Sequence, residues 1–397
     1  MKILFLTDNF VPETNAPATR TYEHCREWVK QGVDVTVITC APNFPKGKVF
    51  KGYKNKLFQK EIIDGIKVIR VWTYISANQG TVKRILDYVS YMISSFLVGL
   101  FIRTDLIIAT SPQFFTAISG RWLAFWKRKK WVMEVRDIWP ESIKAVGAMK
   151  DGYILKYFEY LEHRMYESAD KIVVVTDSFK KYILEPHGIA EEKIAVVKNG
   201  ILSDHFVPKE KDSQLLQDLN LQGKFIIGYI GTHGMAHALD FILMAASKLP
   251  NRNYHFLLVG DGAHKEYLKS LKESLNLENV TMLDNVDKNR VKDYISILDI
   301  GLVNLKKSDT FKSVIPSKIF ELCAMHKPIL IGVEGEAQQI VEGYNVGRSF
   351  IPEDYDSFES QLDQMYHSSN LSYDFKKVLI DFDRRKLAIK MLDFISK

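Results

Sequence analysis

The chain has 397 residues, of which 46% are hydrophobic and 26% are charged, and its formal net charge is +6. This composition argues against a disordered chain, a collagen-like repeat and a protein with many membrane spans. The modest positive charge suits an anionic lipid or a phosphate and is weak evidence for nucleic acid. Three scattered cysteines, and a first segment without the features of a signal peptide, favour a reducing, cytoplasmic compartment with no disulfide scaffold and no zinc site.

Short apolar runs alternate with helical stretches along the chain. Runs that are apolar throughout are typical of parallel strands covered on both faces, and their alternation with helices predicts α/β, doubly wound sheets. Asp64 and Gly65 lie between two β-rich runs and predict a hairpin. The first series of predicted strands is 2–7, 34–39, 106–110, 131–135, 171–176 and 194–197. The second series is 225–230, 255–259, 280–283, 300–305 and 328–333.

The two series are separated by a linker-like stretch at 199–222, which holds an Asn-Gly pair, a proline and a charged run. We therefore predict two Rossmann-like domains of similar size, 1–200 and 201–375. A helical segment at about 376–397 is expected to pack back on the first domain. Right-handed crossovers would place a ligand crevice at the carboxyl ends of the strands.

Two segments of the first domain suggest contact with a membrane surface. The segment 85–102, which is uncharged from residue 88 onward, would form a helix about 27 Å long, which is marginal for a bilayer core of about 30 Å. The segment 120–131 holds five basic residues, three tryptophans and no acid, a pattern suited to lipid headgroups. A long core helix and a solvated helix end are the alternatives. The candidate docking residues are Lys83, Arg84, Phe96, Trp122, Trp126, Lys127, Arg128, Lys129 and Lys130.

Two motifs in the first domain follow predicted strands. The loop 8–20 opens a helix whose N-terminal N–H groups would face an anion, although an ordinary connecting loop is the alternative. The segment 134–141 ends a buried strand and places carboxylates and an arginine where crevice residues belong. We expect the first motif to act through Asn15, Ala16 and Arg20, and the second to supply the catalytic candidates Arg136, Asp137 and Glu141.

The second domain opens with a glycine turn between a strand and a helix. Backbone amides in such a turn suit a diphosphate, to which Thr232 and His233 would add hydrogen bonds. In the later segment 316–325, Lys318 can reach a phosphate and Glu321 can accept hydrogen bonds from sugar hydroxyls; a surface Lys-Glu pair is the alternative. A G-x-G-x-x-G pattern is missing from both domains' first turns, which disfavours a dehydrogenase. The candidate residues are Gly231, Thr232, His233, Gly234, Ser317, Lys318 and Glu321.

Taken together, these motifs resemble glycosyltransferase family 4, the retaining sugar transferases of GT-B fold, in which two Rossmann-like domains face each other across a cleft. The stretches 42–49 and 137–142 resemble a narrower group, the N-acetyl-L-fucosamine-type transferases of bacterial capsule and O-antigen synthesis. The motifs that carry the family resemblance are 11–13, 135–142, 197–200, 231–234, 259–262 and 316–321.

The resemblance implies a UDP-sugar donor held by the C-terminal domain, with no other cofactor and no metal. Residues 231–234 would meet the diphosphate, Lys318 would neutralise it, Glu321 would bond the ribose and Val286 the base. The N-terminal domain would hold the acceptor, a polyprenyl-diphosphate-linked saccharide. The enzyme would then lie peripherally on the cytoplasmic face of the bacterial inner membrane.

The sequence departs from the family pattern at two places that bear on chemistry. Ser313 stands where the family has the first Glu of its E-x7-E pattern, which suggests an unusual donor such as a 6-deoxy sugar. Arg136 precedes Asp137 where many members have His-Asp, and a guanidinium cannot act as a base, although it can stabilise a diphosphate. A nucleotide-sugar epimerase of the same fold and a non-catalytic donor-binding subunit are the alternative functions.

Overall fold

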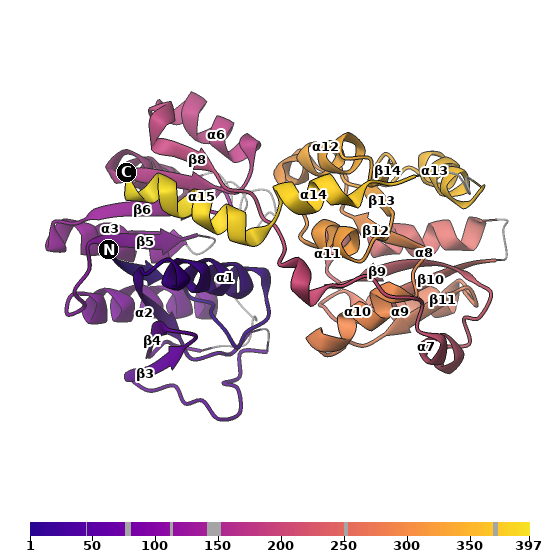
Figure 1. Cartoon of the computed structure of the whole chain (residues 1–397), viewed down its shortest axis with the longest axis horizontal. Helices are drawn as coiled ribbons and strands as arrows, with labels where there is room; N and C mark the ends of the chain where they lie inside the picture. The colour runs from indigo at the N-terminus through magenta and orange to yellow at the C-terminus, as the bar shows by residue number, and fades with distance from the viewer. Residues whose placement is uncertain (45, 76–80, 112–113, 141–151, 250–252, 368–371) are drawn as a thin grey trace. The chain divides into compact units, whose positions relative to one another are not determined.

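The computed structural model describes residues 1–397 except 45, 76–80, 112–113, 141–151, 250–252 and 368–371. The chain forms two compact units (Figure 1). One unit comprises Met1–Asn199 together with Arg384–Lys397, and the other comprises Gly200–Asp383. The predicted returning segment 376–397 is therefore divided. Helix α14 (Phe375–Asp381) packs on α11 (Lys318–Ala324) in the second unit, and only α15 (Arg384–Ser396) belongs to the first.

The first unit is built on an eight-stranded sheet of order β3-β4-β2-β1-β5-β6-β7-β8. All neighbouring strands are parallel except β3 and β4, which form the predicted hairpin; Asp64 and Gly65 both have positive φ, 48° and 80°. The strands are β1 (Lys2–Leu6), β2 (Asp34–Cys40), β3 (Phe58–Ile63), β4 (Ile66–Val71), β5 (Leu106–Thr110), β6 (Lys130–Val135), β7 (Lys171–Val174) and β8 (Ile194–Val196).

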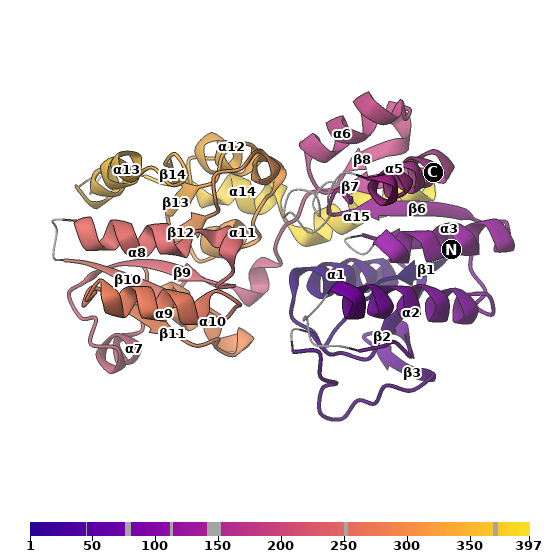
Figure 2. The ribbon, with the colours of Figure 1, turned by 180° about the vertical axis from the view of Figure 1, so that it is seen from behind.

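Helices cover both faces of this sheet because alternate strand residues point to opposite sides. In β1, Ile3 and Phe5 join the core under α1 and α15, whereas Leu4 and Leu6 join the core under α2, α3 and α5. Figures 1 and 2 show α15 lying along α1, and α2 beside α3. The helices are α1 (Ala16–Lys30), α2 (Thr81–Gly99), α3 (Phe114–Lys127), α5 (Tyr153–Ser168), α6 (Asp177–His187) and α15, with a short 3-10 helix at Glu191–Lys193.

The second unit is an all-parallel, six-stranded sheet of order β11-β10-β9-β12-β13-β14. Its strands are β9 (Phe225–Ile230), β10 (Tyr254–Val259), β11 (Val280–Leu283), β12 (Ile300–Asn304), β13 (Ile329–Gly332) and β14 (Gly347–Ser349). Its helices are α7 (Ser213–Asp218), α8 (Leu239–Lys248), α9 (Lys265–Ser274), α10 (Val291–Ser296), α11, α12 (Glu336–Gly343), α13 (Tyr355–His367) and α14. Short 3-10 helices span Ser203–His205, Met235–His237, Lys288–Arg290 and Asp309–Ser313.

Both sheets reverse their strand order beside the first strand of the unit. Strand β1 lies between β2 and β5, and β9 lies between β10 and β12. In open α/β sheets the crevice outside the carboxyl ends of the strands at such a reversal is the usual ligand site. The loops that leave β1 and β9 are therefore the places at which to look for chemistry. The predicted doubly wound α/β architecture and the return of the C-terminal helix onto the first unit are confirmed.

Candidate active site

The glycine turn after β9 is held tightly against the turn after β10. Gly231 and Gly260 both have φ of 152°, and a Cβ on Gly260 would lie 1.8 Å from the Gly231 carbonyl oxygen. The Gly231 N–H donates to the Val259 carbonyl at 2.9 Å, and the His233 N–H donates to the Asp261 carbonyl at 2.9 Å. The two backbones come so close that both glycines of the Gly-Asp-Gly motif after β10 are needed, because a side chain at either position would collide with the turn after β9.

Lys318 at the start of α11 brings a cation to this turn. Its Nζ lies 3.5 Å from the centroid of the Tyr229 ring and 3.0 Å from the position that a Cβ on Gly231 would occupy. Burial lowers the pKa of Lys318 to about 7, and Glu321, one turn later, offsets part of that effect. A buried ammonium over an aromatic face is poised to gain from an incoming anion, because the anion restores the charged state.

Tyr229 was missed by the sequence reasoning although it supports the cation. Its hydroxyl donates to the Thr232 carbonyl at 2.8 Å, which couples the ring to the glycine turn. The Tyr229 side chain is fully buried. The sequence did hold a signal for Tyr229, because it lies two residues before Gly231 near the end of β9. Side chains alternate along a strand, so residues two apart lie on the same side, and Tyr229 therefore lies beside the turn.

The two histidines of the turn are neutral groups. Burial, together with the positive charges of Lys265 and Lys318, lowers the pKa of His233 to about 4. Burial and Lys318 likewise hold the pKa of His237 at about 4. Both ring nitrogens of His233 are buried without a hydrogen-bond partner among the described residues. A neutral imidazole there can donate one hydrogen bond to a ligand but adds no charge.

The remaining predicted donor residues lie around the same end of the sheet. Glu321 and Lys318 line one small cavity together with Gly228. Ser317 precedes α11 without capping it through its side chain, and Gly234 directly precedes the short helix Met235–His237. Val286 lies in the loop after β11 and packs against the apolar core of the second unit. The role of Val286 in holding the base stays a prediction.

Lys265 on α9, another residue outside the predicted set, ties the strand ends together. Its Nζ donates to the Gly260 carbonyl at 2.7 Å, the Leu283 carbonyl at 3.0 Å and Asp284 Oδ1 at 2.5 Å. The side chain of Lys265 is buried, whereas Asp284 is exposed. The lysine therefore fixes the ends of β10 and β11 beside the glycine turn.

In the first unit, Arg20 is buried, whereas the sequence predicted that it would lie in an open loop. The side chain is 1% exposed, and its Nε donates to Glu134 Oε1 at 3.0 Å. Its terminal nitrogens donate to the carbonyls of Val197 and Lys198 at 2.9 Å. Arg20 thereby clamps the chain that leaves β8 to α1 and β6, and it does not lie in an open ligand loop.

Asn15 and Ala16 lie at the start of α1. Asn15 Oδ1 accepts a hydrogen bond from the Ala18 N–H at 3.1 Å and so caps the helix. Asn15 Nδ2 donates to Asn9 Oδ1 at 2.7 Å, which fixes the loop from β1. One helix N–H is therefore already satisfied within the chain, and a ligand would meet the remaining ones.

Arg136 lies in a buried cluster at the end of β6. The pKa of Arg136 is lowered to about 9, chiefly by burial and also by the positive charges of Arg20 and Arg384, while Glu134 opposes the shift. Its Nη1 donates to the Pro17 carbonyl at 3.3 Å, while its Nε is buried without a partner among the described residues. Asp137 follows at the half-buried strand end, and its carbonyl accepts from Ser111 Oγ at 3.4 Å. Glu141 lies outside the described residues.

The predicted docking helices are amphipathic and form part of the outer layer of the first unit. Helix α2 buries Tyr91 and Ser95 and exposes Leu86, Ile93 and Leu97 by about half. Among the described residues, no helix is long and apolar enough to cross a bilayer. Most of the candidates are exposed: Lys83, Arg84, Trp122, Trp126, Arg128, Lys129 and Lys130.

Two docking candidates are less open than expected. Phe96 is half-buried and packs edge-on against Trp122, with ring centroids 5.7 Å apart. Lys127 donates through Nζ to the Leu100 carbonyl at 2.8 Å and so joins the ends of α2 and α3. A further exposed stripe on α5 was missed, although its i, i+4, i+7 spacing is a helical signal. It consists of Tyr153, Tyr157 and Tyr160.

Comparison with known proteins places both units in sugar-transferring families. Residues 15–200 match the glycosyl transferase 4-like domain, and residues 212–378 match the glycosyl transferases group 1 domain. WcaI of Escherichia coli strain K12, named for colanic acid biosynthesis, is 26% identical over 87% of this chain and 86% of its own length. TuaH of Bacillus subtilis strain 168, named for teichuronic acid biosynthesis, is 28% identical over 50% of this chain and 49% of its own length.

Solved structures show the same fold at low identity. Sucrose-phosphate synthase from Thermosynechococcus elongatus has a TM-score of 0.76 at 15% identity and covers 99% of this chain and 97% of its own. Anabaena HepE in complex with UDP-glucose has a TM-score of 0.73 at 16% identity and covers 100% of this chain and 99% of its own. With both of its domain models matched and both Rossmann-like sheets in place, the chain belongs to the family 4 glycosyltransferases and has the GT-B fold.

Proposed function

We propose that this glycosyltransferase moves a sugar from a UDP-sugar to a polyprenyl-diphosphate-linked saccharide during synthesis of a bacterial surface polysaccharide. The observation that carries the donor assignment is the buried Lys318 over the glycine turn of β9. A cation so placed gains most from a ligand that brings negative charge, as a diphosphate does. The names of WcaI and TuaH, which concern surface polysaccharides, support the acceptor class.

The proposed donor sugar is an N-acetylated 6-deoxyhexose such as N-acetyl-L-fucosamine. Ser313 supports this choice, because a hydroxyl stands where most family members have a carboxylate. Ser313 Oγ donates to the Thr310 carbonyl at 3.0 Å, so that hydroxyl is already engaged within its own short helix. A sugar with fewer hydroxyl groups to satisfy fits a site that lacks this carboxylate.

The proposed mechanism is retaining transfer by attack on the face from which the diphosphate leaves. Lys318 and the N–H groups of Thr232 and Gly234 in the glycine turn would stabilise the charge that develops on the leaving diphosphate. A diphosphate oxygen would take the proton of the acceptor hydroxyl, so no protein base and no metal is required. In the first unit, Asp137 and Glu141 would position the acceptor, and Arg136 would meet its anionic part.

A calorimetric titration with UDP, GDP and NAD, each with and without magnesium, tests the donor assignment. The proposal expects UDP to bind equally well with and without magnesium, and NAD not to bind. Selective binding of GDP would keep the family and overturn the UDP-sugar assignment. Sugar-nucleotide isomerisation in the donor-only reaction would instead identify an epimerase.

UDP binding is expected to weaken as the pH rises above 7. The pKa of Lys318 is about 7 in the free protein, and a neighbouring diphosphate favours the charged amine and raises that pKa. The complex then holds one more proton than the free protein, so the affinity should fall by up to about tenfold per pH unit between pH 7 and 9. Calorimetry across this range measures the slope. The Lys318→Arg variant stays charged and should bind with a flat profile, whereas a flat wild-type profile would contradict the assignment.

Membrane docking through α2 and α3 is the proposed reason for their exposed aromatic and basic side chains, on the cytoplasmic face of the inner membrane. Trp126 is 69% exposed and Trp122 is 41% exposed. Replacing both with alanine should reduce recovery of the protein with anionic vesicles about tenfold, because indole rings favour the headgroup region. Tyr267→Ala on α9, with Tyr267 51% exposed, is the matched control. Unchanged vesicle recovery of the double variant, with unchanged thermal stability, would rule out this docking surface.

A further inference from the structure

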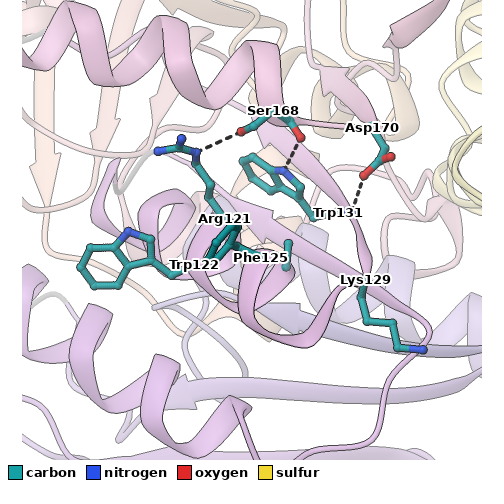
Figure 3. Close-up of a pocket in the computed structure, with 8 residues that line it drawn as sticks. Arg121, Trp122, Phe125, Lys129, Trp131, Ser168 and Asp170 are labelled. Carbon is teal, nitrogen blue, oxygen red and sulfur yellow. Dashed lines mark hydrogen bonds between the residues drawn. The ribbon is translucent and has the colours of Figure 1, made fainter.

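A pocket of about 490 Å³ opens at the end of α3 in the first unit. Its wall is formed by the last two turns of α3, by the start of β6 and by the turn that connects α5 to β7 (Figure 3). The amino ends of the strands meet at this edge of the sheet, so the pocket lies away from the strand ends that carry the candidate active site. Nothing in the proposed reaction uses it.

The polar wall of the pocket is ordered by three hydrogen bonds. The Arg121 Nε donates to Ser168 Oγ at 3.1 Å, and the Trp131 Nε1 donates to the Ser168 carbonyl at 2.8 Å. The Trp131 backbone N–H donates to Asp170 Oδ2 at 2.9 Å. Figure 3 shows the guanidinium turned toward Ser168. In the described part of the chain its terminal nitrogens make no hydrogen bond or ion pair, so they are available to a ligand.

The charge around the pocket favours an anion. Arg121 and Lys129 line it, and Lys193 reaches the same turn, with its Nζ 3.3 Å from the Ala169 carbonyl. Asp170 is the acidic residue in the lining, and one of its oxygens already accepts the Trp131 N–H. Arginine presents paired N–H groups that match phosphate oxygens, and the flexible Lys129 side chain can add a second positive charge.

The opposite wall is apolar and opens onto exposed aromatic surface. Trp122 and Phe125 line the pocket, and Phe125 is 78% exposed. Trp126 packs edge-on against Phe125, with ring centroids 6.2 Å apart. Phe101, just beyond α2, is 87% exposed, and the Lys127–Leu100 hydrogen bond places the ends of α2 and α3 together. A phosphate flanked by apolar chains fits this combination of walls better than a free phosphate ion does.

We propose that this pocket binds the headgroup of one anionic phospholipid, with its phosphate on Arg121 and its acyl chains along Phe125 and Trp122. This inference deepens the proposed membrane docking and rests on it. Diffuse attraction between a basic surface and a charged bilayer has no fixed stoichiometry. The pocket instead predicts a saturable site for one lipid per chain.

The test uses dihexanoyl phosphatidylglycerol, a short-chain lipid, below its micelle concentration with the full chain in calorimetry. One-to-one binding is expected. Arg121→Gln should weaken it at least tenfold, because a charge-assisted phosphate contact is lost. Phe125→Ala should weaken it about threefold to tenfold, and the exposed position makes this variant safe for folding. Lys181→Gln, at an exposed lysine of α6 outside the pocket and outside the docking candidates, is the matched control and should change affinity less than twofold.

Three results would overturn the site: no saturable binding, an equal loss in Lys181→Gln, or equally tight binding of inorganic phosphate. A dimer in sedimentation that lipid does not dissociate would assign the pocket to a second copy of the chain. UDP titrations of the same samples distinguish failure of the lipid site from failure of the donor assignment. Normal UDP binding without lipid binding would reject this site alone, whereas the loss of UDP binding in the wild-type protein would reject the proposed donor.

Discussion

Replacing Lys318 with glutamine is expected to lower kcat/KM for sugar transfer about 100- to 1000-fold. This is the usual loss when one preorganised group that stabilises developing charge is removed from a buried site. Lys318 lies over the Tyr229 ring and within reach of the Gly231 turn, so a diphosphate on that turn would face its ammonium directly. The measurement is transfer from the UDP-sugar identified by titration, with UDP affinity measured in parallel.

The same variant should fold more stably than the wild type near neutral pH. Burial lowers the pKa of Lys318 from 10.5 in the unfolded chain to about 7 in the folded one. Between these values the unfolded state binds more protons, so wild-type stability rises with pH across that window. Lys318→Gln should lack this rise. Lys307→Gln, at an exposed lysine of the same unit, is the control for both assays. Full activity of the Lys318→Gln variant would contradict the donor assignment, because that assignment rests on Lys318.

Replacing Arg20 with alanine is expected to destabilise the protein by about 3–5 kcal/mol. Breaking a buried ion pair leaves a buried charge without its hydrogen-bonded partner, here Glu134, which is 1% exposed. Burial raises the pKa of Glu134, and Arg20 and Arg136 outweigh that effect and hold the pKa below its usual value. The variant also loses the hydrogen bonds from Arg20 to Val197 and Lys198. Denaturant unfolding of the full chain measures the change.

A surface ion pair of the same unit provides the control for Arg20. Lys67 and Asp34 are 2.8 Å apart, and their side chains are 57% and 38% exposed. Lys67→Ala should cost less than about 1 kcal/mol, because water screens an exposed pair. A loss below about 1 kcal/mol in Arg20→Ala as well would show that Arg20 is free to serve a ligand, as its place in the loop after β1 first suggested.

The regular features of the fold were predictable because they depend on local patterns. Continuous apolar runs identified the parallel strands, and the Asp64-Gly65 pair identified the hairpin, since both residues adopt positive φ in the turn. Strand β14 was missed because its three residues, Gly347–Ser349, are half-buried and carry no apolar run. The spacing of Lys318 and Glu321 on one helix face also follows from local geometry.

Interactions between distant segments decided the rest. Local sequence could not assign the buried role of Arg20, since its partners lie 114 and 177–178 residues away. Nor could it divide the C-terminal helices, because α14 and α15 pack against different units. Lys318 lies over the Tyr229 ring, and Gly260 contacts Gly231, only because parallel strands bring separate turns together. The sequence by itself determined the family, the elements and the residue types of the donor turn, because those depend on neighbours along the chain. Burial and charge balance at each site belonged to the tertiary structure, because they depend on neighbours in space.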